Sequence, residues 1–182
     1  TILDEMRLFK NEVELKSIKK AIEITTEAHI AAMKKAHAGV YEFELEAEIM
    51  AVFMRNGARN PAYPSIVGGG ENACILHYTD NKDRVEDGEL VLIDAGAEYG
   101  CYAADITRTF PVNGIFTAEQ KDLYEIVLSA QQAAIEKVKP HNHWDEPHLA
   151  ALLVIVEGLK DLGILSGSTN EIVETEIYKK FF

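Results

Sequence analysis

Two aspartates, Asp94 and Asp105, stand out in this sequence because each adjoins an apolar, strand-like run. They lie at the two ends of the segment DAGAEYGCYAAD, within the longer stretch LVLIDAGAEYGCYAADITRTF. A carboxylate in such a setting costs free energy unless it is paired or binds a metal ion. The pair is therefore the first candidate for chemistry in this chain.

A tight turn at Tyr99–Gly100 would fold this segment into a hairpin, with Gly100 supplying the unusual backbone angles. That turn predicts Asp94 and Asp105 to be direct cross-strand neighbours, with Cβ atoms about 5 Å apart. Their repulsion would then be about 3 kcal/mol at an effective dielectric constant of 20. Divalent cations offset such repulsion best, so the pair indicates a metal site. A solvated hairpin and a carboxyl pair that shares one proton are the alternatives.

His77 is the third candidate. It lies in CILHYTD, at the end of a stretch, NACILHY, that is interpreted as the strand preceding the one with Asp94. A histidine there could hydrogen-bond a substrate or a developing oxyanion, or bind a metal ion. Four glutamates of a nearby helical segment are instead expected to form a solvated face: Glu42, Glu44, Glu46 and Glu48.

The elements around these candidates follow from periodicity and capping signals. Asn11 and Glu14 form a capping-box pattern that predicts a helix running toward Gly39, and a second helix is predicted to end near Gly57. The stretches ELVLIDAGA and CYAADITRTFPV are typical of strands, and helices return after Thr117 and near Asp145. Helices, then antiparallel strands, then helices indicate an α+β fold.

Composition excludes several classes of partner. The net charge of −12 argues against nucleic acid and anionic membranes, and no apolar run approaches the roughly 20 residues of a membrane helix. Two cysteines do not make a disulfide framework, so we expect reduced thiols and a cytoplasmic location. The chain starts at Thr1 and stops at an aromatic pair, which suggests a piece of a longer protein.

Several stretches closely resemble the catalytic domain of Xaa-Pro aminopeptidases: IVGGGENACILHYTDN, LVLIDAGAEYGCYAADITRTFPVNG, FTAEQKDLYEIVLSAQQAAI and, at the opening, EMRLFKNEVELKSIKKA. The resemblance implies a pita-bread fold, in which two similar halves surround a site for two divalent ions, usually manganese. It implies that Asp94 and Asp105 are metal ligands and that His77 lies beside the substrate. It also implies that Thr107 and Arg108, from DITRTF, are supporting residues.

The implied reaction is hydrolysis of the N-terminal residue from peptides with proline in second position. Residues 1–182 would be the N-terminal portion of the catalytic domain, without the family's N-terminal domain and without the second half, which supplies a histidine and two glutamates. The piece alone is therefore expected to bind metal weakly and to lack activity, and we expect a homo-oligomer. Prolidase, which cleaves only dipeptides, and a non-catalytic peptide- or protein-binding module are the alternatives.

Overall fold

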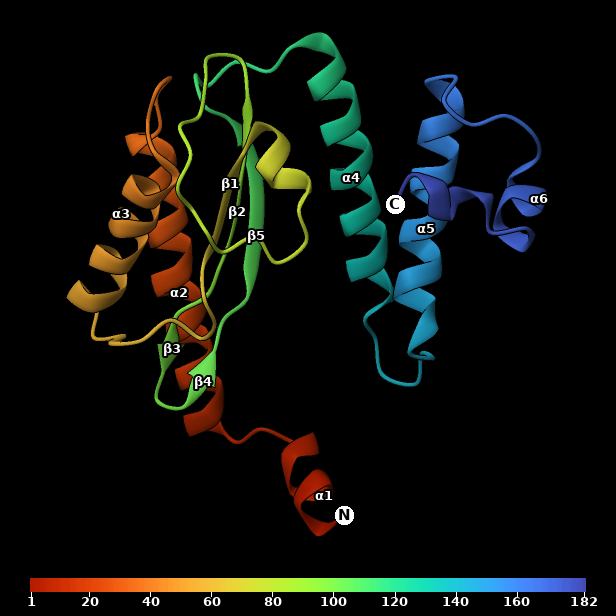
Figure 1. Cartoon of the computed structure of the whole chain (residues 1–182). Helices are drawn as coiled ribbons and strands as arrows, with labels where there is room; N and C mark the ends of the chain where they lie inside the picture. The colour runs from red at the N-terminus through yellow and green to blue at the C-terminus, as the bar shows by residue number, and fades with distance from the viewer. The chain divides into compact units, whose positions relative to one another are not determined.

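The computed structural model describes residues 1–182 and divides into two units, residues 1–115 and 116–182. The first unit begins with helices and continues as antiparallel strands, and the second unit is helical (Figure 1). This order confirms the α+β class. No helix combines the length and the apolar composition that a membrane crossing requires.

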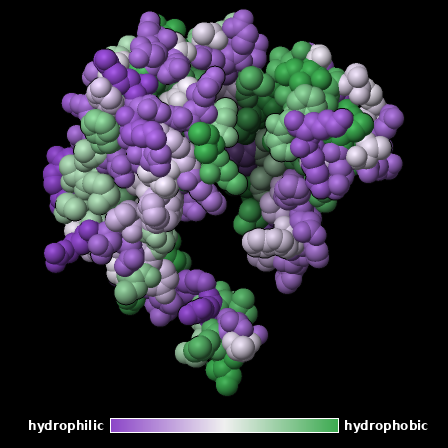
Figure 2. Space-filling model, in the orientation of Figure 1, coloured by the Kyte–Doolittle hydropathy of each residue, from purple (hydrophilic) through white to green (hydrophobic).

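Three helices open the first unit: α1 (Ile2–Leu8), α2 (Glu12–Lys35) and α3 (Glu42–Arg55). The predicted capping box at the start of α2 is confirmed, since the Asn11 side chain accepts from the Glu14 amide at 3.0 Å and Glu14 accepts from the Asn11 amide at 2.7 Å. Apolar side chains of α1 lie exposed at the surface, as Figure 2 shows at the lower end of the view.

A three-stranded antiparallel sheet follows, with the order β1 (Ile66–Gly69), β2 (Leu90–Ala95), β5 (Ile106–Pro111). A short ribbon of β3 (Glu98–Tyr99) and β4 (Tyr102–Ala103) extends the β2–β5 hairpin. Helices α2 and α3 lie beside the sheet (Figure 1) and share one apolar core with it.

Strand β2 shows which face of the sheet the helices cover. Val91, Ile93 and Ala95 are buried in the core with residues of α2 and α3, whereas Leu92 and Asp94 are only half-buried. Successive side chains of a strand point to opposite faces, so Asp94 lies on the face away from this core.

The predicted strand NACILHY is wrong. Residues Gly70–Cys74 form a 3₁₀ helix, η1, and a turn follows it. η1 folds back onto β1, and a Cβ on Gly68 would lie only 2.9 Å from the backbone of Asn72 and Ala73. The glycine-rich segment thus allows a close backbone approach that a strand pattern does not reveal.

The second unit contains α4 (Ala118–Lys137), α5 (Asp145–Asp161), α6 (Thr169–Glu174) and a 3₁₀ helix, η2 (Ile177–Lys180). The capping box predicted at Thr117 and Gln120 is confirmed. A small core joins α5 to the segment that follows it, built from Leu152, Val156, Leu159, Leu165 and Ile172.

Candidate metal site at the β2–β5 hairpin

The hairpin between β2 and β5 has a different register from the predicted one. Tyr99 pairs with Tyr102 and Asp94 pairs with Thr107, so the turn is Gly100–Cys101 rather than Tyr99–Gly100. Both turn residues have positive φ angles, 60° and 66°. This is the pattern of a type I′ turn, whose twist matches that of the flanking strands. The prediction failed because a left-handed cysteine carries no sequence signal.

The change of register leaves the two aspartates on one face of the hairpin. Asp105 precedes Thr107 by two positions, and Thr107 faces Asp94 directly, so Asp105 is a diagonal neighbour of Asp94. A third residue confirms this proximity: the Tyr63 hydroxyl lies 2.6 Å from Asp94 Oδ1 and 3.0 Å from Asp105 Oδ1. The structure therefore brings both carboxylates to one point, although it does not place them directly opposite each other.

Tyr63 reaches this point from the loop before β1, and its ring lies against the backbone at Gly96. Burial, followed by the contacts with Asp94 and Asp105, raises the pKa of the Tyr63 hydroxyl, which stays protonated. One hydroxyl proton can bond only one carboxylate well at a time. The hydroxyl therefore satisfies one carboxylate at a time and brings no positive charge to offset the repulsion between them. Sequence reasoning missed Tyr63 because nothing local in NPAYPS indicates its partners.

The two supporting candidates lie on different faces of the sheet. Thr107 is opposite Asp94 and shares its face. Arg108 is opposite Ile93, whose side chain is buried in the core on the other face. The Arg108 Nη1 donates to the Thr107 carbonyl at 2.7 Å. Thr107 is therefore the one of the two that adjoins the carboxylate pair.

His77 lies in the loop after η1, exposed and with a positive φ of 55°. On β1, Ile66 pairs with Asp94, and Gly68 lies on the same face as Ile66. The helix η1 packs at Gly68 and therefore lies on the face of the sheet that carries Asp94. The loop with His77 therefore leaves the sheet on the side of the carboxylate pair. His77 makes no hydrogen bond or ion pair with either aspartate.

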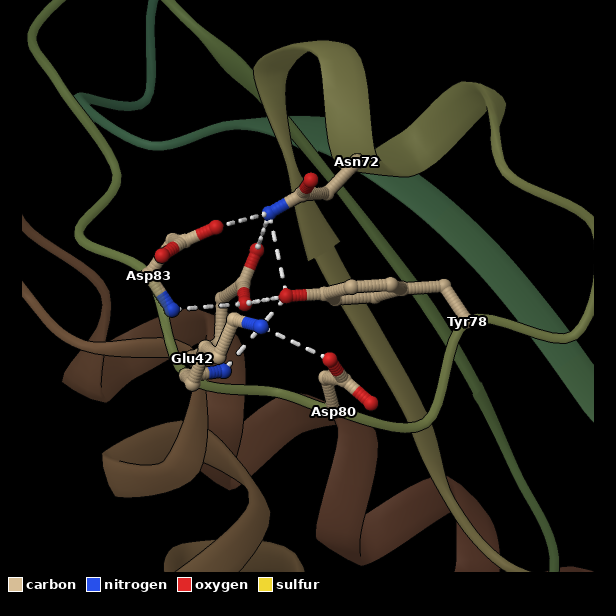
Figure 3. A network of polar contacts seen from close by, with 6 residues as sticks. Glu42, Asn72, Tyr78, Asp80 and Asp83 are labelled. Carbon is tan, nitrogen blue, oxygen red and sulfur yellow. Dashed lines mark hydrogen bonds and ion pairs between the residues drawn. The ribbon is translucent and has the colours of Figure 1, made fainter.

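The expected solvated face of glutamates is wrong for Glu42. This side chain is buried and accepts four hydrogen bonds, and Figure 3 shows the network around it. Glu46 also has a buried partner, because its Oε2 accepts from the Asn81 amide nitrogen at 2.9 Å. Helical spacing alone does not reveal that a loop covers these two positions.

A buried histidine, His29, lies on the other side of the hairpin. Both of its ring nitrogens are buried without a well-directed hydrogen bond, although the backbone of Ala95 and Ile106 lies close to the ring. Burial lowers the pKa of His29 because it disfavours the charged imidazolium. The ring is therefore neutral where α2 meets the site-bearing strands.

The carboxylate pair supplies hard oxygen ligands, which suit divalent ions such as Mn²⁺ or Mg²⁺. No group of three or more histidine, cysteine, aspartate or glutamate side chains comes together in this chain to hold a metal ion. Asp94 and Asp105 are therefore compatible with part of a metal site, and further ligands would have to complete it.

Comparisons with known proteins identify the family of this chain. The family described as metallopeptidase family M24 matches residues 16–179. The chain belongs to this metallopeptidase family. Among characterised relatives, it is 47% identical to the Xaa-Pro aminopeptidase of Escherichia coli and 46% identical to that of Haemophilus influenzae, each over 181 residues.

Solved structures give the same result for the fold. An Escherichia coli aminopeptidase P variant in complex with substrate matches with a TM-score of 0.96 at 47% identity, over 100% of this chain and 41% of that chain. Aminopeptidase PepP of Pseudomonas aeruginosa matches with a TM-score of 0.94 at 49% identity, over 96% and 40%. The chain thus has the fold of the N-terminal part of the pita-bread domain. It spans 41% of the Escherichia coli Xaa-Pro aminopeptidase and 42% of the Haemophilus influenzae one.

Proposed function

We propose that this chain is part of a Xaa-Pro aminopeptidase, a metallopeptidase that removes the N-terminal residue from peptides with proline in second position. The observation that carries the proposal is the convergence of Asp94 and Asp105 on the Tyr63 hydroxyl, on one face of a hairpin, in a chain of family M24. A fold shared with aminopeptidase P over the whole chain, at 47% identity, supports the same activity.

The residues would divide the work as follows. Asp94 and Asp105 would hold two divalent ions, for which we propose manganese; a zinc-substituted aminopeptidase P in complex with product supports a divalent ion. Such a pair supplies an activated water and polarises the scissile carbonyl. His77 would donate a hydrogen bond to the substrate, and Thr107 would support the ligand Asp94 from the facing strand.

The remaining ligands would come from outside residues 1–182. Two carboxylates are too few for two divalent ions, so residues 1–182 would form the N-terminal portion of a catalytic domain that further segments complete. We also propose a homo-oligomeric, cytoplasmic protein whose partners are peptides rather than nucleic acids or membranes. The net charge of −12 supports the choice of partners, and the two unpaired cysteines support the cytoplasmic location.

The proposal is tested with Asp94→Asn and His77→Ala in the complete enzyme. Asp94→Asn removes an anionic ligand, so we expect loss of bound manganese together with most of the turnover of a Xaa-Pro-Xaa tripeptide. His77→Ala should keep its metal content and lose turnover, because His77 is assigned to the substrate. Metal analysis and kinetics of both variants decide this, and equal loss of metal in both would refute the division of roles.

The same assay separates the two alternative functions. Turnover of an Xaa-Pro dipeptide without turnover of the tripeptide would identify a prolidase. Binding of peptides with no turnover of either, in a protein with its full complement of manganese, would identify a non-catalytic module.

A further inference from the structure

We propose that Glu42 is a positioning residue for the reaction, because it fixes the loop that carries His77. This inference rests on the proposed function. The loop runs over residues 70–84, from the start of η1 to the residue after Asp83, and is called the His77 loop below. Glu42 is the first residue of α3 and lies far from the loop in the sequence.

The Glu42 carboxylate accepts four hydrogen bonds, and Figure 3 draws the three that come from Asn72, Tyr78 and Asp83. Oε1 accepts from the Gly69 amide at 2.8 Å and from Asn72 Nδ2 at 3.0 Å. Oε2 accepts from the Tyr78 hydroxyl at 2.7 Å and from the Asp83 amide at 3.0 Å. One buried side chain thus binds the end of β1 and both arms of the His77 loop.

A carboxylate is the group that this position requires. Two donors face each oxygen, and an ionised carboxylate accepts at both oxygens without donating. Burial and the bond to Glu42 raise the pKa of Tyr78 to about 12, so the Tyr78 hydroxyl remains a donor. A buried charge with this many bonds is stabilised against its desolvation cost, whereas an amide would turn an NH₂ group toward donors.

A second anchor lies one turn further along α3. Glu46 accepts from Asn81, whose side chain also bonds the Val67 amide and the Ser65 carbonyl at 3.0 and 2.9 Å. Asn81 is buried and has a positive φ of 45°. Two glutamates on one face of α3 therefore hold the C-terminal arm of the His77 loop against β1.

The tip of the loop has no comparable anchor. Ile75 is 53% exposed and Leu76 is 86% exposed, and His77 is also exposed. The left-handed backbone of His77 is unfavourable for a residue with a Cβ, so the surrounding structure must hold it. Tyr78 follows directly and is the nearest anchored residue. The direction of the His77 ring consequently depends on the bond between Tyr78 and Glu42.

The first test needs no catalysis and uses the chain of residues 1–182. Glu42→Gln and Tyr78→Phe should both speed amide hydrogen exchange in residues 70–84 and shift the His77 imidazole signals in an NMR spectrum. Glu48→Gln is the matched control on the same helix, because Glu48 pairs with Arg55 away from the loop. Unchanged exchange and unchanged His77 signals in Tyr78→Phe would overturn the proposal, even if Glu42→Gln failed to fold.

The second test measures turnover in the complete enzyme with bound manganese. Glu42→Gln and Tyr78→Phe should each lower kcat by about 10- to 100-fold, as small misplacements of a substrate-contacting group do, while metal content stays constant. In the His77→Ala background, the same changes should lower kcat less than about twofold, because the residue through which they act is gone. Equal losses in both backgrounds would overturn the inference.

The two tests separate this inference from the proposed function. If His77→Ala leaves turnover unchanged, the proposed role of His77 is wrong. The inference then fails with it, because Glu42 cannot act on turnover through a residue that turnover does not need. A third outcome is that the loop loosens in the variants and His77→Ala lowers turnover, but Glu42→Gln and Tyr78→Phe lower kcat equally in both backgrounds. In that case only the positioning role fails.

Discussion

Replacing Tyr63 with phenylalanine removes the hydroxyl that both carboxylates share and leaves the ring that packs at Gly96. A hydrogen bond from a neutral donor to a charged acceptor contributes about 1.5–3 kcal/mol. Asp94 is half-buried and Asp105 is exposed, so solvent screens the second contact and the repulsion between the carboxylates. We therefore expect Tyr63→Phe to reduce the stability of the metal-free first unit by about 1.5 kcal/mol, the low end of that range.

The assay must report the first unit alone. The single tryptophan, Trp144, lies in the second unit and is 90% exposed, so its fluorescence would not follow this change. Hydrogen exchange of the β2 and β5 amides as a function of urea reports the opening free energy of the strands themselves. Tyr99→Phe is the control, since the Tyr99 ring packs against the core of the first unit and its hydroxyl makes no hydrogen bond.

The control should change the opening free energy by less than about 0.5 kcal/mol. If Tyr63→Phe and Tyr99→Phe behave alike, the hydroxyl does not bond the carboxylates in solution. A more stable Tyr63→Phe would show that the hydroxyl costs more to bury than its contacts return. The first result would remove the observation on which the proposed site depends, and the second would refute the stabilising effect expected of the hydroxyl.

Two further predictions concern the surroundings of the site. Gly68→Ala places a methyl group 2.9 Å from the backbone of η1, so we expect a loss of about 1–3 kcal/mol, with faster exchange in η1 than in α2; an unchanged melting temperature would contradict the close approach. Because the pKa of His29 is lowered in the folded chain, the unfolded chain binds a proton at this residue more readily than the folded chain does. The free energy of unfolding should therefore fall as the pH drops below about 6.5, and above that pH it should not depend on His29. His29→Leu should flatten the stability profile in that acidic window, and a profile identical to the wild type would show that His29 titrates normally.

Much of the fold could be predicted from the sequence because local rules decide it. The capping boxes at Asn11 and Thr117 act within three residues, and both helices begin where these signals lie. The period of two along a strand is equally local. The predicted turn was wrong by a register shift of two positions, since Asp94 pairs with Thr107 and not with Asp105. Because side chains alternate with a period of two, Asp94 and Asp105 remain on one face.

The errors arose where distant segments decide the structure. The Tyr63 hydroxyl contacts residues 31 and 42 positions away, and Tyr78 contacts Glu42 across 36 positions. No pattern within one helix or strand reports such partners. Glu42 has the sequence signature of a solvated helix start, yet its burial is decided by the loop that folds over it.

This contrast separates two kinds of residue in the proposed site. The spacing of Asp94 and Asp105 within one hairpin places both carboxylates on one face, so we expect their geometry to depend mainly on that hairpin and on Tyr63. His77 lies on a loop whose tip is exposed and whose arms are held by α3, so its geometry depends on a side chain outside the hairpin. If these residues bind metal and substrate as proposed, substitutions in α3 should alter substrate turnover while leaving the metal ligands in place. Loss of metal on substitution of Glu42 would show instead that the two parts are not independent.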